Sequence, residues 1–358
     1  VKIAIMLLLF IQMLQSLVNP SLAGIMVEFP GYDTTMYQTI INVATLTEVI
    51  AALLVGMLVN KIGWKTMGII GCILALIGGV GPIFFGVSVE ALIGIRAVFG
   101  IGYGIVYGMA AGSVGTFWRG KDCTQVAGLI ALAAGFSGII YSLAASAITA
   151  AVGAENWRMI YQINWICVPI AIYLLIFLPN KSKLLEEEEA AQAAEAVEAA
   201  EPTEKRSGGF AGLGKDYWLL MGAVVLTLGA VCVFMNNIAM TVVGSGVDPT
   251  GAAIGIIMTG FSVGLLLGGP IYMPMYRALK RLTMPVLFII DFVAFLLFMM
   301  FPGYIMYIVL ATVIGCVFGL INSNWYDMSA KKVKNFPEAS ALGGSFYVVV
   351  AGIAQFSG

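Results

Sequence analysis

Histidine is absent from this chain of 358 residues, and charged residues make up only 10% of it. The commonest general base and one of the main zinc ligands are therefore missing. The five cysteines show no CxxC spacing, and we interpret them as small apolar packing residues. Paired acids on one face and a serine–base arrangement are also lacking, so we expect no metal, no cofactor and no enzyme activity.

The shortage of charge indicates that lipid surrounds the folded chain. Hydrophobic residues make up 60% of it, and its mean hydropathy is +0.98. Soluble domains carry about 25% charged residues and roughly 45–50% apolar ones, so this chain has too little polar surface to cover a water-soluble globule. The net charge of −1 argues against a nucleic-acid partner.

Eleven apolar runs are long enough to cross a bilayer, which takes about 20 residues in a helix. The runs cover residues 3–27, 36–60, 66–87, 90–115, 124–151, 157–178, 217–242, 250–276, 283–302, 304–326 and 338–358. Because the runs are continuous rather than alternating, we predict an all-α polytopic bundle instead of a membrane barrel. The first run has a second interpretation as a signal peptide, but its length favours a span.

Basic residues predict the orientation. Of the 18 Lys and Arg residues, all but Arg96 and Arg158 fall at the N-terminus or in every second connection between runs. The remaining connections carry acids, namely Glu28, Asp33, Glu90, Glu155 and Asp248. Since positive charge is retained on the cytoplasmic side, we expect a multi-pass protein of the cell membrane with its N-terminus in the cytoplasm.

One long hydrophilic stretch divides the chain into two parts. Residues 181–216 are rich in Glu and Ala, and we interpret them as a solvated cytoplasmic linker, with a regulatory segment as the alternative. Residues 1–180 would form a first half of six spans, and residues 217–358 an incomplete second half of spans seven to eleven. A twelfth span is expected beyond Gly358.

The connection between the second and third runs carries a recognisable motif. Residues 56–65 read GMLVNKIGWK, and this segment resembles the signature loop of the major facilitator superfamily, Gly-x-Leu-x-Asp-Arg-x-Gly-Arg-Lys. The matching positions are Gly56, Leu58, Lys61, Gly63 and Lys65. Asn60 replaces the family's acid, so it could cap a helix but could not supply the charge of a gate lock.

The resemblance implies a monomeric secondary active transporter, which would move a small solute across the membrane by alternating access. Its two halves would be bundles of six helices, surrounded by membrane lipid. Proton coupling is a further hypothesis. A proton-coupled drug antiporter is one alternative, although span five lacks the Gly-Pro element typical of that group. A membrane-embedded sensor that binds solute without transporting it is an alternative of another class.

Two polar stripes are candidates for the solute cavity. In the first run, Gln12, Gln15 and Asn19 lie on one helical face; in the fourth run, Arg96, Tyr103 and Tyr107 do. The resemblance places both spans at the central cavity, whereas the alternative is structural hydrogen bonding between helices. Two weaker candidates lie near span ends, Asn236 and Asn322.

Two carboxylates lie deep in the apolar runs, Glu48 and Asp291. Charged groups at this depth are costly, and burial favours the neutral form of a carboxyl. With histidine absent, these two residues are the candidates for proton coupling. Glu48 could alternatively pair with Arg96.

Overall fold

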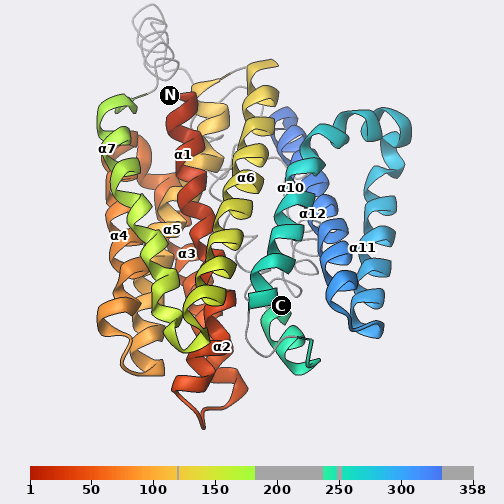
Figure 1. The fold of residues 1–358 in the computed structure, drawn as a ribbon. Helices are drawn as coiled ribbons and strands as arrows, with labels where there is room; N and C mark the ends of the chain where they lie inside the picture. The colour runs from red at the N-terminus through yellow and green to blue at the C-terminus, as the bar shows by residue number, and fades with distance from the viewer. Residues whose placement is uncertain (119–120, 182–236, 248–251, 333–358) are drawn as a thin grey trace, which may run out of the picture.

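The computed structural model describes residues 1–118, 121–181, 237–247 and 252–332, which contain helices and turns and no strands. The first bundle comprises α1 (Lys2–Met13), η1 (Leu14–Leu17), α2 (Val18–Glu28), α3 (Thr34–Ile62), α4 (Trp64–Phe85), α5 (Val89–Phe117), α6 (Lys121–Val152), η2 (Ala154–Ile166) and α7 (Cys167–Phe177). The second bundle comprises α10 (Ala252–Leu279), η4 (Lys280–Leu282), α11 (Thr283–Met300) and α12 (Tyr304–Lys332) (Figure 1). Residues 237–244 are also helical.

Within these described ranges, nine segments are long and apolar enough to cross a membrane. They coincide with nine of the eleven predicted runs, which confirms the predicted fold class. The run 338–358 lies outside the described residues, as do residues 217–236 of the seventh run.

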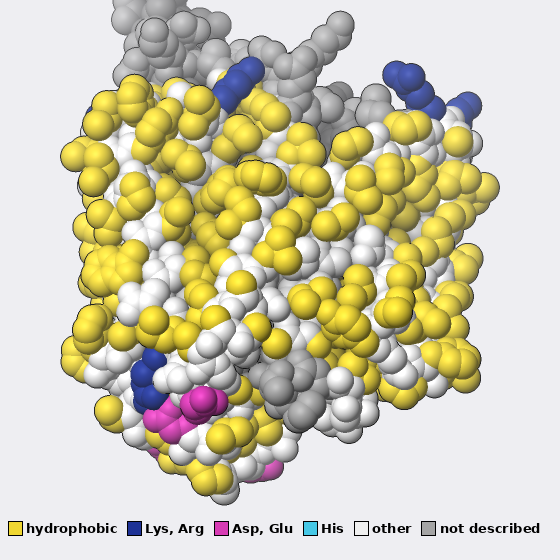
Figure 2. Space-filling model, in the orientation of Figure 1, with side chains coloured by type: hydrophobic (Ala, Val, Ile, Leu, Met, Phe, Trp, Pro, Cys, Tyr) yellow, Lys and Arg dark blue, Asp and Glu magenta, His cyan; other side chains and the backbone are white. Residues whose placement is uncertain are grey.

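The surface has the composition expected for contact with lipid. On α11, one stripe is buried and most of the other large side chains are exposed, including Phe292 at 64% and Met299 at 78%. Figure 2 shows hydrophobic side chains covering the middle of the molecule, whereas charged side chains lie at its two ends. Lys and Arg are seen at one end, and the Asp and Glu side chains lie at the other end beside a further basic side chain. This distribution matches an apolar belt between two polar ends.

Small residues allow close contact between helices. A Cβ atom at Gly104 of α5 would meet the backbone of Glu48 on α3 at 2.5 Å, and one at Gly264 of α10 would meet the backbone of Thr312 on α12. Such contacts bring helix backbones together where lipid offers no hydrophobic drive for association.

The two bundles meet along α6 and α10, which lie side by side in Figure 1. The Ser146 hydroxyl donates to the carbonyl of Ala252 at 2.7 Å. Further along the same pair of helices, Gly138 lies against Ser262 and Gly135 against Leu266. The contact is therefore made mostly by small side chains.

Both the first and the sixth span contain a tighter helical segment, which lies in the middle of the first span and forms the first half of the sixth. The 3-10 segments η1 and η2 are followed by α2 and α7, and each of these helices has a proline as its third residue, Pro20 or Pro169. Proline has no N–H to donate and crowds the preceding turn, so it is best tolerated in the first turn of a helix. In the first span, the segment that precedes Pro20 by three residues is a 3-10 turn that contains Gln15.

Candidate functional site

Arg96 connects the two predicted polar stripes. Its side chain is only 1% exposed, and it extends from α5 toward the 3-10 turn of the first span. An Nη2–H donates to Oε1 of Gln15 at 2.5 Å, and Nε–H donates to the carbonyl of Ile40 on α3 at 3.4 Å. The guanidinium thus joins the first, second and fourth spans inside the bundle.

A column of aromatic rings continues from Arg96 along α5. The guanidinium carbon lies 4.8 Å from the centre of the Phe99 ring. Phe99 stacks on Tyr103 at 6.1 Å, and Tyr103 lies 6.0 Å from Tyr107. Phe99 was not among the predicted residues, although its spacing of three residues from Arg96 places it on the same helical face. A cation held over an aromatic face is stabilised by the ring quadrupole.

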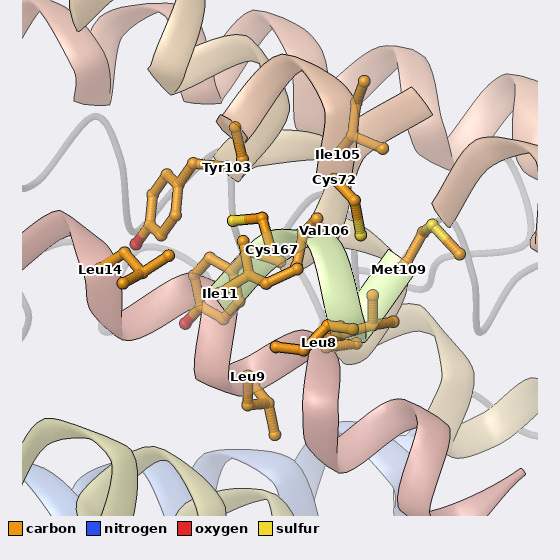
Figure 3. Close-up of a cluster of buried hydrophobic side chains, with 14 of the residues drawn as sticks. Leu8, Leu9, Ile11, Leu14, Cys72, Tyr103, Ile105, Val106, Met109 and Cys167 are labelled. Carbon is orange, nitrogen blue, oxygen red and sulfur yellow. The ribbon is translucent and has the colours of Figure 1, made fainter. Parts of the chain in front are cut away.

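The phenol of Tyr103 reaches into an apolar cluster. Figure 3 shows it beside Leu14, with Ile11 of the same cluster next to Leu14. From η2, Tyr161 also interacts electrostatically with Arg96, and its hydroxyl lies 3.1 Å from Oγ of Ser21. Arg96 therefore lies where polar groups of the first, fourth and sixth spans meet an apolar core.

Several buried polar atoms near the middle of the first bundle have no hydrogen-bond partner among the described residues. They include Oε1 of Gln12, Oδ1 of Asn19 and both carboxylate oxygens of Glu48. Buried polar groups without partners are uncommon in folded proteins, because each loses its contact with water without a replacement.

Glu48 does not pair with Arg96. The carboxylate is fully buried on α3, and in the described part of the chain it forms neither an ion pair nor a hydrogen bond with the guanidinium. Asp291 is also buried, with one unpartnered oxygen, but it belongs to α11, on the side of the second bundle away from α5. The two candidate carboxylates are therefore far apart in the fold.

The signature loop packs against the end of α7. Gly63 joins α3 to α4 with a φ of 99°, a conformation that favours glycine. Trp64 N–H donates to the carbonyl of Asn180 at 2.8 Å, and Trp64 packs edge-on against Phe117. Of the other loop candidates, Gly56 is buried, Lys61 is exposed and Lys65 is half-buried. The side chain of Asn60 lies outside the described residues.

At the opposite end, four groups form a contact that the sequence analysis did not predict. Arg158 makes a two-pronged ion pair with Glu28, and it also donates to the carbonyl of Gly86. The indole N–H of Trp157 donates to the same carboxylate at 2.7 Å. This Glu28–Arg158 brace joins the ends of α2, α4 and η2.

Two of the predicted cavity residues cannot be placed. Asn236 lies outside the described residues, and Asn322 belongs to α12 but its side chain is not described. The neighbouring Asn237 accepts a hydrogen bond from Gln38 of α3 at 3.2 Å. The described residues contain no group of three or more His, Cys, Asp or Glu side chains that could hold a metal ion.

Two helical bundles with an apolar belt, joined through small residues and enclosing a buried polar site, define a polytopic α-helical membrane protein. Residues 4–358 match the family model of the Major Facilitator Superfamily. The chain belongs to this superfamily of membrane transporters. No curated relative matches the sequence.

Solved structures share the fold. The proton:xylose symporter XylE bound to 6-bromo-6-deoxy-D-glucose aligns with a TM-score of 0.66 at 13% identity, covering 99% of this chain and 86% of XylE. The human organic anion transporter MFSD10 aligns with a TM-score of 0.66 at 14% identity, covering 100% and 91%. A partially occluded inward open conformation of XylE from E. coli gives 0.65 at 14% identity, covering 99% and 89%.

Proposed function

We propose that this protein is a secondary active transporter that moves a small solute across the cell membrane by alternating access. The observation that carries the proposal is the contact of Arg96 with Gln15, deep inside the first bundle. Membership of the superfamily supports the general function, and Arg96 with its polar neighbours Gln15 and Tyr161 would supply the chemistry of a solute site.

The contact between α6 and α10 supports the movement of one bundle against the other. Along these two helices the contact is built largely from small side chains and one hydroxyl–carbonyl hydrogen bond, which would allow the helices to slide or separate. A cluster of larger apolar side chains, which includes Leu22 of the first bundle and Met258 of the second, would have to separate at one end when the bundles rock. The end with the basic residues would face the cytoplasm, following the rule that positive charge stays inside.

Proton coupling through Glu48 is the finer part of the proposal. A fully buried carboxyl without a partner changes its interactions strongly when it gains or loses a proton. XylE, to which this fold is similar, is a proton:xylose symporter. Asp291 is the second candidate, but its place on α11 separates it from the polar groups around Arg96.

Flux into proteoliposomes tests the transport proposal. The purified chain would be reconstituted and screened with labelled sugars, amino acids and carboxylates, with protein-free liposomes as the control. We expect saturable uptake of at least one solute and its exchange with unlabelled solute. Saturable binding without uptake would instead support the sensor.

Glu48→Gln tests the coupling. In the native protein we expect an inward proton gradient to drive accumulation of the solute above equilibrium. The variant should still exchange solute across the membrane but should lose gradient-driven accumulation, because the neutral amide cannot release a proton. Asp291→Asn tests the second candidate in the same assay, and it should keep the response if Glu48 is the coupling residue. Accumulation by Glu48→Gln equal to that of the native protein would exclude Glu48 as the coupling residue.

A further inference from the structure

We infer that the solute is a small monocarboxylate whose charged group is bound by the Arg96 guanidinium. This inference rests on the proposed transport function and names the class of substrate. In the conformation described, Arg96 is buried, so the solute would reach it when the two bundles separate.

The first observation is the absence of an internal counter-ion. Every hydrogen bond of Arg96 within the described residues goes to a neutral acceptor, namely the Gln15 amide or the Ile40 carbonyl. In the printed sequence, residues 217–236 and 339–358 contain no Asp or Glu. Glu48 and Asp291 are the deep carboxylates of the apolar runs, and neither pairs with Arg96. Among the described residues, the positive charge of Arg96 therefore has no acidic partner.

The second observation concerns the donors that remain. A guanidinium carries five N–H groups, and the hydrogen bonds described above use one on Nε and one on Nη2. Both N–H groups of Nη1 and one N–H group of Nη2 remain available as donors, and all three lie in the plane of the guanidinium. A carboxylate can accept two such donors side by side, which a hydroxyl of a neutral sugar cannot match.

The Glu28–Arg158 brace provides an internal reference for this geometry. There, Nη1 and Nη2 of Arg158 donate to the two oxygens of the Glu28 carboxylate. Gln15 occupies the corresponding place beside Arg96 with a neutral amide, so it orients the guanidinium but leaves its charge available. One unneutralised cation matches one negative charge, which favours a monocarboxylate over a dicarboxylate or phosphate.

The test uses the purified full chain and measures the binding of lactate, acetate and benzoate by calorimetry. The amides of the same acids serve as neutral counterparts, with succinate, inorganic phosphate and xylose as competitors of other classes. We expect at least one monocarboxylate to bind about tenfold or more tightly than its amide, because the charged hydrogen bonds are lost in the amide.

Gln15→Glu is the decisive variant. The new carboxylate would lie beside Arg96, keep the hydrogen bond and neutralise the cation, so carboxylate affinity should fall by about tenfold or more while the fold is retained. A purely structural role for Arg96 would leave the affinity unchanged. Gln162→Glu is the matched control, because Gln162 is exposed on η2, and it should bind normally. Arg96→Lys, which keeps the charge but not the planar fork, should retain weakened binding.

Several results would overturn the inference. These are equal affinity for acid and amide, preferential binding of succinate, phosphate or xylose, no binding of any monocarboxylate, or unchanged affinity in Gln15→Glu. Carboxylate binding without flux in proteoliposomes would instead refute the transport proposal and leave the assignment of the anion site intact. If instead a neutral solute is transported and Gln15→Glu does not change its flux, the anion-site assignment is refuted and the transport proposal stands.

Discussion

The ends of the first bundle differ from its middle in how polar groups are satisfied. At one end, Glu28 receives hydrogen bonds from both Arg158 and Trp157; at the other, the signature loop is tied to Asn180. In the middle, Arg96 lacks a carboxylate partner and Glu48 has unpartnered oxygens in the described structure. Complete contacts hold helices together, whereas incomplete ones leave interactions for a ligand. The proposed function therefore assigns stabilisation of the bundle to its ends and binding of the solute to its middle.

Arg96→Gln is expected to have the largest effect on function. Losing the charged donors should reduce uptake of the transported solute by about 10- to 100-fold, which corresponds to hydrogen bonds to a charged group. The melting temperature should change little, because the variant also removes an unneutralised buried charge. Uptake into proteoliposomes and thermal unfolding would be measured together. Arg277→Gln, at an exposed position of α10, is the control, and uptake that survives in Arg96→Gln would rule out a binding role.

Gly63→Ala should show the largest effect on stability. Its φ of 99° is unfavourable for a residue with a Cβ, which would also meet Oδ1 of Asn180 at 2.6 Å. The free energy of unfolding should fall by about 1–3 kcal/mol, as measured by thermal unfolding in detergent. Gly94 lies at an exposed position of α5 with open space around it, so Gly94→Ala should not destabilise the protein. Equal melting temperatures for the two variants would show that the loop does not hold the bundle.

Glu28→Gln breaks the brace and should have a smaller effect. The paired side chains are 30% and 33% exposed, so the ion pair should contribute about 1 kcal/mol or less. We expect a modest fall in melting temperature that diminishes in high salt, with the affinity for solute unchanged. Glu155→Gln, an exposed acid on η2, is the control. A loss of solute affinity would place the brace in the binding site.

Tyr32→Phe is expected to have the smallest effect. The Tyr32 hydroxyl donates a long hydrogen bond of 3.4 Å to the exposed Glu90, and this bond raises the pKa of Tyr32. Because the pKa is raised in the folded state, the bond contributes below the ordinary pKa of about 10 and is lost only at higher pH. The melting temperatures of variant and native protein should therefore stay nearly equal between about pH 6 and pH 8. A pH-dependent difference in that range would contradict this assignment.

Much of the fold could be predicted from the sequence, because hydropathy averaged over a span depends little on any single contact. The division of the sixth span before Pro169 was not predicted, since the proline lies within an apolar run. The signature motif identified Gly63 from the sequence. Its packing against Asn180 could not be predicted, because Asn180 lies far along the chain.

The site was predictable only in part. Helical spacing placed Gln15 on one stripe and Arg96 on another, but their contact depends on how two helices rotate and at what depth each residue lies. The pairing of Glu28 with Arg158 joins residues 130 positions apart, and single-sequence patterns carry no signal for it. The sequence also allowed a pair between Glu48 and Arg96, which the structure does not contain. Single-sequence patterns likewise carry no signal for or against that contact.

A paired measurement of stability and solute affinity in Arg96→Gln and Glu28→Gln tests the division between middle and ends most directly. We predict opposite outcomes: Arg96→Gln loses affinity and keeps its melting temperature, whereas Glu28→Gln keeps its affinity and melts at a lower temperature. If Arg96→Gln melts earlier than Glu28→Gln and binds solute as tightly as the native protein, Arg96 is a structural residue and the solute site lies elsewhere.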